Sequence, residues 1–216
     1  MPTTEPPRGA SRLLHAARAG VLYSVRLPIR IAVRARVLGE GRAPLRGGLI
    51  VAANHASFAD PVVLQSYLPR HLTYLMTERL YHLPGLHWFF RFWGVLSVKE
   101  DGLNKGPLRA AERVLASGGA VGIFPEGGIS RDGLVHDARP GIAALARRAG
   151  VPILPVGLAG IERLLPPDTW RLHPSRVALC MGDLIDPEGQ SRDGLAARVT
   201  RDLRACAARA REALAD

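Results

Sequence analysis

Cysteine and lysine are scarce in this chain. Its two cysteines, Cys180 and Cys206, fall in different expected elements and lack metal-type spacing. A disulfide framework is therefore not expected, and a reducing compartment is favoured. Lys99 and Lys105 are the only lysines, so 27 of the 29 basic residues are arginines.

Long apolar runs are absent as well. No stretch of about 18 uncharged apolar residues occurs, so a transmembrane helix is not expected. Arginines interrupt the apolar part of the N-terminus, which argues against a cleavable signal peptide. The chain has no internal repeat and no recognised nucleic-acid motif, although its formal net charge is +10. With 216 residues, 47% of them hydrophobic, it suits a single globular domain.

Apolar β-branched runs alternate with helical patterns along the chain. This alternation predicts an α/β domain with a mixed, largely parallel sheet covered by helices. Pro152 and Pro155 lie in one of the apolar runs and suit a strand end or an edge strand. Strands are expected over 48–53, 72–76, 120–124, 151–157 and 176–181, and helices over 61–68, 105–116, 141–149 and 194–214.

A histidine and an aspartate five positions apart follow the first of these strands. Asp60 and Pro61 are favoured at a helix start, so His55 is expected in the turn before a helix. Such a pair supports general base catalysis, with His55 as the base and Asp60 fixing its tautomer. The alternative is that Asp60 only caps the helix and that His55 is a partly buried loop residue.

A second polar turn follows the expected strand 120–124. It contains Glu126, three glycines within 127–133, Ser130 and Arg131. In an open α/β sheet, sites gather at the carboxyl ends of the strands. The two turns are therefore expected to face one crevice.

Taken together, these segments resemble the glycerolipid acyltransferases of the 1-acyl-glycerol-3-phosphate acyltransferase type. The family's block of His, four residues and Asp matches residues 55–60, and its Phe-Pro-Glu-Gly block matches residues 124–127. Its later Val-Pro block, which ends in Pro-Val, matches residues 151–156. The three blocks occur in the family's order, and the resemblance spans about residues 45–185.

The resemblance implies transfer of a fatty acyl group from acyl-CoA or acyl carrier protein to a lipid hydroxyl. The most direct acceptor is 1-acyl-glycerol-3-phosphate, in phospholipid biosynthesis, and the alternative is a non-phosphate acceptor such as a glycolipid. His55 would be the base and Asp60 its partner, and no cofactor, metal ion or covalent acyl-enzyme is required. Glu126, Gly127, Gly128 and Ser130 would shape the acceptor site.

The chain departs from the phosphate-acceptor enzymes at two points. Where they read Glu-Gly-Thr-Arg-Ser, this chain has Gly128 and Ile129 in place of the Thr and the Arg. The family's middle block ends its strand with arginine, and here Lys99 stands instead, which holds a phosphate only as a point charge. Lys99, Arg131 or Arg139 is expected to supply the missing charge. The alternative is that the two arginines are solvated loop residues and that the acceptor carries no phosphate at this place.

Basic charge is concentrated in residues 1–46, which hold nine arginines against Glu5 and Glu40. Residues 1–9 are polar and proline-rich and are expected to be disordered, whereas 10–40 are expected to form basic amphipathic helices, kinked or divided at Pro28. The acyltransferase domain would then cover residues 41–216.

Arg26, Arg30 and Arg34 recur every four residues and would line one helical stripe. We expect this stripe to bind an anionic membrane, each arginine adding about 1 kcal/mol, so that the enzyme is peripheral at the cytoplasmic face of the cell membrane. The alternative is a helix packed on the domain with a solvated charged face. The aromatic residues of 80–98 indicate core packing first, and an acyl-chain tunnel or interfacial belt second.

Two other classes of function remain open. Ser57 near His55 would be the nucleophile of a hydrolase or thioesterase, although no Gly-x-Ser-x-Gly elbow is present. A non-catalytic binder of anionic surfaces is the other class. Nucleic acid is not an expected partner, and the oligomeric state is left open by the sequence.

Overall fold

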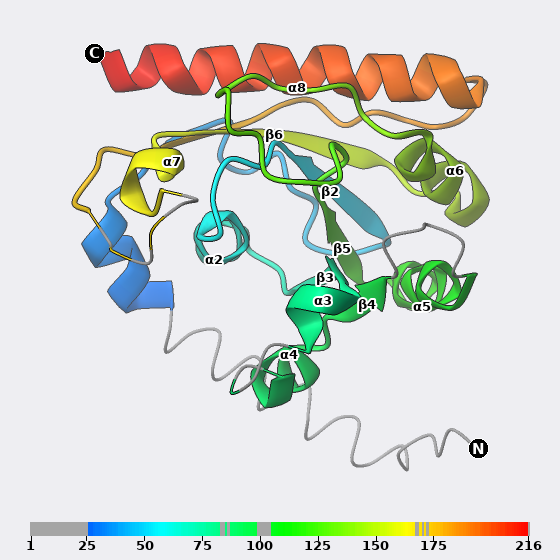
Figure 1. Ribbon diagram of the computed structural model, residues 1–216. Coiled ribbons are helices and arrows are strands. Elements are labelled where there is room, and N and C mark those ends of the chain that lie inside the picture. Colours follow the sequence, from blue (N-terminus) through cyan, green and yellow to red (C-terminus); the bar gives the residue numbers. More distant parts are fainter. Residues whose placement is uncertain are drawn as a thin grey trace.

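A computed structural model describes residues 26–82, 85, 87–98, 105–166, 169, 171 and 173–215. Seven strands form one sheet in the order β1-β7-β6-β2-β5-β3-β4 (Figure 1). Every neighbouring pair is parallel except β6 with β7. The predicted α/β domain with a mixed, largely parallel sheet covered by helices is confirmed.

The elements follow the predicted alternation of strands and helices. The strands are β1 (Arg36–Leu38), β2 (Leu49–Ala53), β3 (Leu72–Thr77), β4 (Leu96–Val98), β5 (Ala120–Ile123), β6 (Ile153–Ala159) and β7 (Ala178–Met181). The helices are α2 (Asp60–Tyr67), α3 (Glu78–Tyr81), α4 (His87–Trp93), α5 (Lys105–Ala116), α6 (Pro140–Ala149), α7 (Ile161–Leu164) and α8 (Arg192–Ala215). Residues 26–33 form a further helix before β1.

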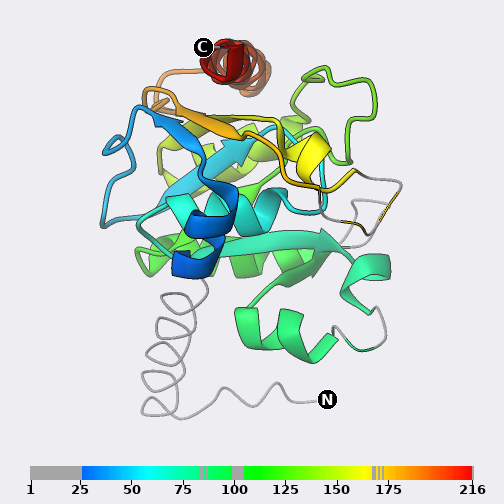
Figure 2. The same cartoon turned by 90° about the vertical axis from the view of Figure 1, so that its left-hand side faces the viewer.

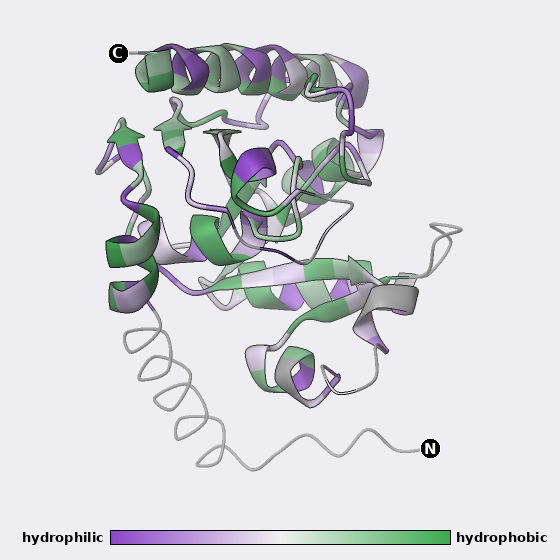
Figure 3. Cartoon of the chain, turned by 60° about the vertical axis from the view of Figure 1, so that its left-hand side comes forward, coloured by the Kyte–Doolittle hydropathy of each residue, from purple (hydrophilic) through white to green (hydrophobic). Residues whose placement is uncertain are grey.

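Strand β2 lies at the centre of the sheet and is buried on both faces, as its continuous apolar run predicts. Leu49, Val51 and Ala53 pack into one cluster with α2, α7 and the helix 26–33. Ile50 and Ala52 point the other way, toward α5, α6 and α8. Figures 1 and 2 show these helices on the two sides of the sheet, and Figure 3 shows hydrophilic and hydrophobic residues alternating along α8.

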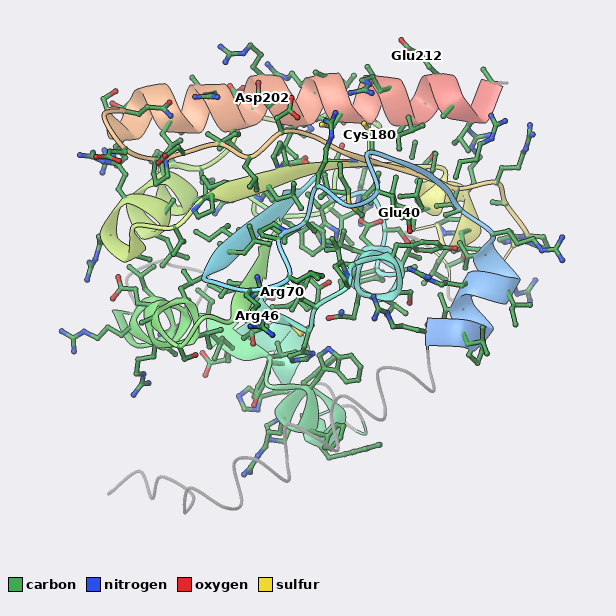
Figure 4. The ribbon with its side chains drawn as sticks, turned by 180° about the vertical axis from the view of Figure 1, so that it is seen from behind. Glu40, Arg46, Arg70, Cys180, Asp202 and Glu212 are labelled. Atoms are coloured by element: carbon green, nitrogen blue, oxygen red, sulfur yellow. The ribbon has the colours of Figure 1, made fainter. Side chains whose placement is uncertain are left out.

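Arg70 joins three loops at the amino ends of β2 and β5, the end of the sheet away from the polar turns. Its guanidinium donates to the carbonyl oxygens of Pro44, Gly47 and Gly118, at 2.6 to 3.1 Å. Figure 4 shows this side chain beside Arg46 at the back of the molecule. Hydrogen bonds from a charged group contribute about 1.5 to 3 kcal/mol each, so Arg70 braces the strand starts.

Two local predictions about the sheet are wrong. Arg36–Leu38, placed within a helical segment, is strand β1, which pairs with β7 at the sheet edge. β6, placed at a strand end or edge, lies between β2 and β7. Pro155 lies one residue before the β6–β7 ladder, which starts at Val156, and its carbonyl accepts the Gly182 N–H just past the end of β7. The missing N–H therefore falls where that ladder stops.

The helix 26–33 packs on the domain through its arginines. Arg26 and Arg30 donate to the carbonyl of Ser66 near the end of α2, at 3.2 and 2.9 Å, and the Arg30 guanidinium lies 5.0 Å from the centre of the Tyr67 ring. Arg34 follows the last helical residue with a φ of 41°. The three arginines do not form one stripe along a helix, and Pro28 lies within the helix.

The aromatic segment forms a small satellite cluster. Trp93 and Val95 are buried, with Met76, Tyr81, Phe90 and Phe92 packed against them. Trp88 points outward and is 69% exposed. Core packing therefore accounts for part of the segment.

Gly157 in β6 tests how closely α8 approaches the sheet. A Cβ at this position would overlap the backbone of Cys206 and Ala207 in α8. We expect Gly157→Ala to lower the free energy of unfolding by at least about 1–3 kcal/mol, because a packed backbone cannot retreat without strain. Gly141→Ala in α6 is the control: it meets open space, and we expect a gain of about 0.5–1 kcal/mol. Equal urea midpoints for the two variants would contradict this packing.

Candidate active site

The two polar turns meet at the carboxyl ends of neighbouring parallel strands. β2 lies between β5 and β6 and is parallel to both, so the carboxyl ends of all three strands lie at the same end of the sheet. His55 follows β2 by two residues, and Glu126 follows β5 by three. The two turns lie together there, as predicted, and the His55 N–H donates to Glu126 Oε1.

Asp60 folds back over the turn that carries His55. One carboxylate oxygen, Oδ2, accepts the N–H groups of Ala56 and Ser57 at 2.7 and 2.8 Å and lies 2.8 Å from His55 Nδ1. Asp60 is fully buried, whereas the His55 side chain keeps 17% exposure. Asp60 was predicted to be the cap of α2. It is instead the first helical residue, after Ala59, and the partners of its side chain, His55, Ala56 and Ser57, all precede the helix.

Burial raises the pKa of Asp60 above its usual value, against the lowering effect of the hydrogen bonds from His55, Ser57 and Ala56. The second oxygen, Oδ1, has no hydrogen-bond partner among the described residues. A buried carboxylate with one unpaired oxygen is costly to keep. In this protein the buried carboxylate lies where it orients the ring of His55.

The His55 ring is held in plane by an aromatic stack. Its centre lies 4.1 Å from that of Phe124, with 19° between the planes, and Phe124 in turn stacks on Tyr74 at 6.2 Å. The Tyr74 hydroxyl donates to the carbonyl of Pro61, beside Asp60. Gly122 makes room for the stack, because a Cβ there would lie 2.5 Å from the Tyr74 ring. β3, β5 and the turn after β2 thus fix one ring.

The main chain of His55 is clamped by the turn after β5. Its N–H donates to Glu126 Oε1 at 3.1 Å, and its carbonyl accepts the N–H of Ser130 at 2.7 Å. Glu126 Oε2 accepts the N–H of His136 at 3.4 Å. Half-burial raises the pKa of Glu126, which these hydrogen bonds partly oppose. Both carboxylate oxygens of Glu126 thus bind backbone groups of the protein itself.

Arg139 braces the same turn. Its Nε donates to the carbonyl of Glu126 at 3.2 Å, and its guanidinium lies against Gly127. Gly127 has a φ of 81°, and a Cβ there would overlap the Arg139 side chain. Glycine is therefore required at position 127 both by the left-handed backbone and by the space that Arg139 occupies.

A cavity of about 220 Å³ opens beside His55. Of the residues predicted to bind the acceptor, Ser130 lines it, whereas Gly128 and Arg131 are exposed and do not. Lys99 falls outside the described residues. Among the residues described, no cluster of His, Cys, Asp and Glu is placed to hold a metal ion. The cavity is lined by Asn54, His55, Ala56, Ser130, Gly133, Leu134, Leu158, Ala159, Gly160, Glu162, Arg163, Arg211 and Leu214.

Asn54 is a structural residue of the site that the sequence did not single out. Its buried amide donates to the carbonyl of Leu158 at 3.1 Å and accepts the N–H of Leu158 at 2.7 Å. The side chain extends the β2–β6 pairing beyond the strand end. Its position directly before His55 was the one available signal. Arg163 and Arg211 gave none, because they lie outside every motif.

Comparison with known proteins identifies the class of domain to which this sheet and its His–Asp pair belong. The model of the acyltransferase family matches residues 34–159. The chain belongs to that family. A crystal structure of the 1-acyl-sn-glycerophosphate (LPA) acyltransferase PlsC from Thermotoga maritima superposes with a TM-score of 0.76 at 27% identity, covering 94% of this chain and 83% of that one.

Curated relatives carry similar names. The chloroplastic 1-acyl-sn-glycerol-3-phosphate acyltransferase BAT2 of Brassica napus is 27% identical over 119 residues, 54% of this chain and 34% of that protein. The 1-acyl-sn-glycerol-3-phosphate acyltransferase of Borreliella burgdorferi is 26% identical over 124 residues, 56% of this chain and 50% of that protein. This chain thus spans between a third and a half of the length of these relatives.

The contact between His55 and Asp60 predicts a tautomer. With Asp60 Oδ2 beside Nδ1, neutral His55 should carry its proton on Nδ1 and leave Nε2 unprotonated. His136 is an internal control, because its Nε2 lies 3.1 Å from Asp132 Oδ1. The Ser130 hydroxyl and the Leu134 N–H lower the pKa of Asp132 to about 2, so it stays ionised. We expect ¹⁵N NMR to show opposite tautomers for the two histidines. An Nε2-protonated His55 would contradict the geometry.

Proposed function

We propose that this protein transfers a fatty acyl group from a thioester, acyl-CoA or acyl carrier protein, to the free hydroxyl of 1-acyl-glycerol-3-phosphate. The observation that carries the proposal is the 2.8 Å contact between His55 Nδ1 and the buried carboxylate of Asp60. The names of the relatives and of the structural neighbour support the choice of acceptor.

His55 acts as the general base in this scheme. Its Nε2 accepts the proton of the acceptor hydroxyl as that oxygen attacks the thioester carbonyl. The tetrahedral intermediate then collapses, the carbon–sulfur bond breaks, and the thiolate takes the proton back from the imidazolium. Asp60 keeps Nε2 unprotonated at the start and stabilises the imidazolium between the two steps. Glu126 and Ser130 hold the backbone that carries the ring.

Hydrolysis through Ser57 fits the structure less well. Ser57 is fully buried, its hydroxyl donates to the carbonyl of Leu165 at 2.6 Å, and its oxygen accepts the N–H of Ala59. A nucleophile must reach its base and the substrate carbonyl. Ser57 instead ties the turn to the segment after α7.

We expect His55→Ala and Asp60→Asn each to lower turnover by at least about 100-fold while the protein stays folded, because they remove the base and its orienting group. Ser57→Ala is the matched control and should keep turnover within about 10-fold, since the hydroxyl takes no part in the reaction. Release of thiol matched to a new diacyl product is the measurement. Near-normal transfer by folded His55→Ala would refute the mechanism.

We further propose that the enzyme is peripheral at the cytoplasmic face of the membrane. The described part of the chain contains no helix long and apolar enough to span a bilayer. Leu27 and Ile31, one turn apart on the helix 26–33, are 64% and 59% exposed. Arg26 and Arg30 point to α2. The proposed contact is therefore made by apolar side chains, with Arg34 as an electrostatic addition.

The double variant Leu27→Ser/Ile31→Ser tests this contact. We expect it to weaken partition to anionic vesicles by about 10-fold or more, because two large side chains no longer transfer out of water. Arg34→Gln should remove part of the salt dependence. Leu184→Ser, which alters another partly exposed apolar residue, should bind as wild type. Equal partition of the double variant and the wild type in co-sedimentation would count against this surface.

A further inference from the structure

The cavity at His55 has two arginines in its walls. Arg163 belongs to α7, after the carboxyl end of β6, and Arg211 to the last turns of α8. The two residues come from elements about 50 positions apart in sequence and line the same 220 Å³ space as His55. Neither residue lies in a matched motif.

The charge of this lining favours an anion. Glu162 is the only acidic residue among the lining residues, and it lies 3.5 Å from Arg163 Nε, so the two arginines leave a net charge of +1 when His55 is neutral. Arg211 is held in place by the hydrogen bond from its Nη2 to the carbonyl of Gly133 at 2.5 Å. A guanidinium presents five N–H donors in a planar fork, so both arginines have further donors for a ligand.

The basic residues of the second motif do not reach this space. Arg139 is directed to Glu126 and Gly127, and neither Arg139 nor Arg131 lines the cavity. Ile129, at the place of the family's arginine, carries no charge. Among the described residues that line the cavity, the arginines are Arg163, after β6, and Arg211, in α8.

We propose that Arg163 and Arg211 form an anion subsite that binds a phosphate group of a substrate next to His55. The proposal rests on the acyl transfer proposed above and assigns a phosphate-recognising role to residues outside the matched blocks. A cavity of 220 Å³ is equivalent to about seven waters at roughly 30 Å³ each, enough for a phosphate and a few carbon atoms. Arginine suits this ligand because its fork matches the phosphate oxygens.

The phosphate has two chemical sources, the monoester of the acceptor and the phosphates of the donor carrier. Binding without turnover separates them. We would titrate the full chain calorimetrically with glycerol 3-phosphate and, separately, with coenzyme A, for the wild type, Arg163→Gln, Arg211→Gln and the double variant. Arg192→Gln, on the first turn of the same helix α8 and away from the cavity, is the charge-matched control.

We expect each single variant to weaken binding of one of these ligands by about 10-fold, as loss of a charged hydrogen bond implies, and the control to bind normally. A loss confined to glycerol 3-phosphate, with a raised KM for lysophosphatidate, assigns the subsite to the acceptor. A loss confined to coenzyme A, with a raised KM for the donor, assigns it to the carrier. Arg211→Lys, which keeps a donor for the Gly133 carbonyl, guards against misfolding of Arg211→Gln.

Binding of both ligands that is unchanged in the folded double variant would overturn the proposal. So would binding that weakens equally in Arg192→Gln, since that would reflect net charge alone. If the arginines control phosphate binding but no acyl transfer to any acceptor is detected, the subsite stands and the proposed function fails. The two ideas are therefore tested separately.

Discussion

The buried carboxylate of Asp60 is the constraint on which the site depends. Its Oδ2 gathers two backbone N–H groups and one imidazole nitrogen, so the turn from His55 to Asp60 has one compact shape. Because burial raises the pKa of Asp60, its ionised form lowers stability as pH rises above the usual aspartate range, a cost that the apolar sheet must offset. The same carboxylate fixes the direction of the His55 ring.

The parallel sheet makes that turn part of a larger unit. β2, β5 and β6 end side by side, so single hydrogen bonds are enough to join the segments that follow them. Glu126 and Ser130 bind the His55 backbone from the turn after β5. Asn54, the residue before His55, binds the main chain of Leu158 in β6. Phe124 covers the ring itself. A side chain positioned by three strands loses little freedom when a ligand binds, and the general base proposed for this site would need such preorganisation.

The sequence was most informative where local chemistry and tertiary structure agree. The apolar runs of β2 and β5 and the helix start at Asp60-Pro61 all predicted their elements. It was misleading where tertiary contacts override local preference. Asp60, which favoured the N-cap position, binds the turn before the helix instead, as its expected contact with His55 requires. Pro155 was expected at a strand end or an edge and lies inside the sheet. No local pattern reports that Arg163 and Arg211 line one cavity, because that depends on how α8 crosses β6.

The arginines show why net charge alone is a weak guide to function here. Many of them bind main-chain carbonyls: Arg26 and Arg30 near the end of α2, Arg36 and Arg176 at the end of α8, and Arg70 at the strand starts. A cation at a helix C-terminus is favoured by the helix dipole, and each carbonyl it binds is one fewer unsatisfied acceptor. Such residues add to the charge of +10 while their side chains bind carbonyl groups of the domain itself. What a charged residue recognises is decided by its surroundings, and Arg163 and Arg211 differ from these arginines in lining the cavity that contains the histidine.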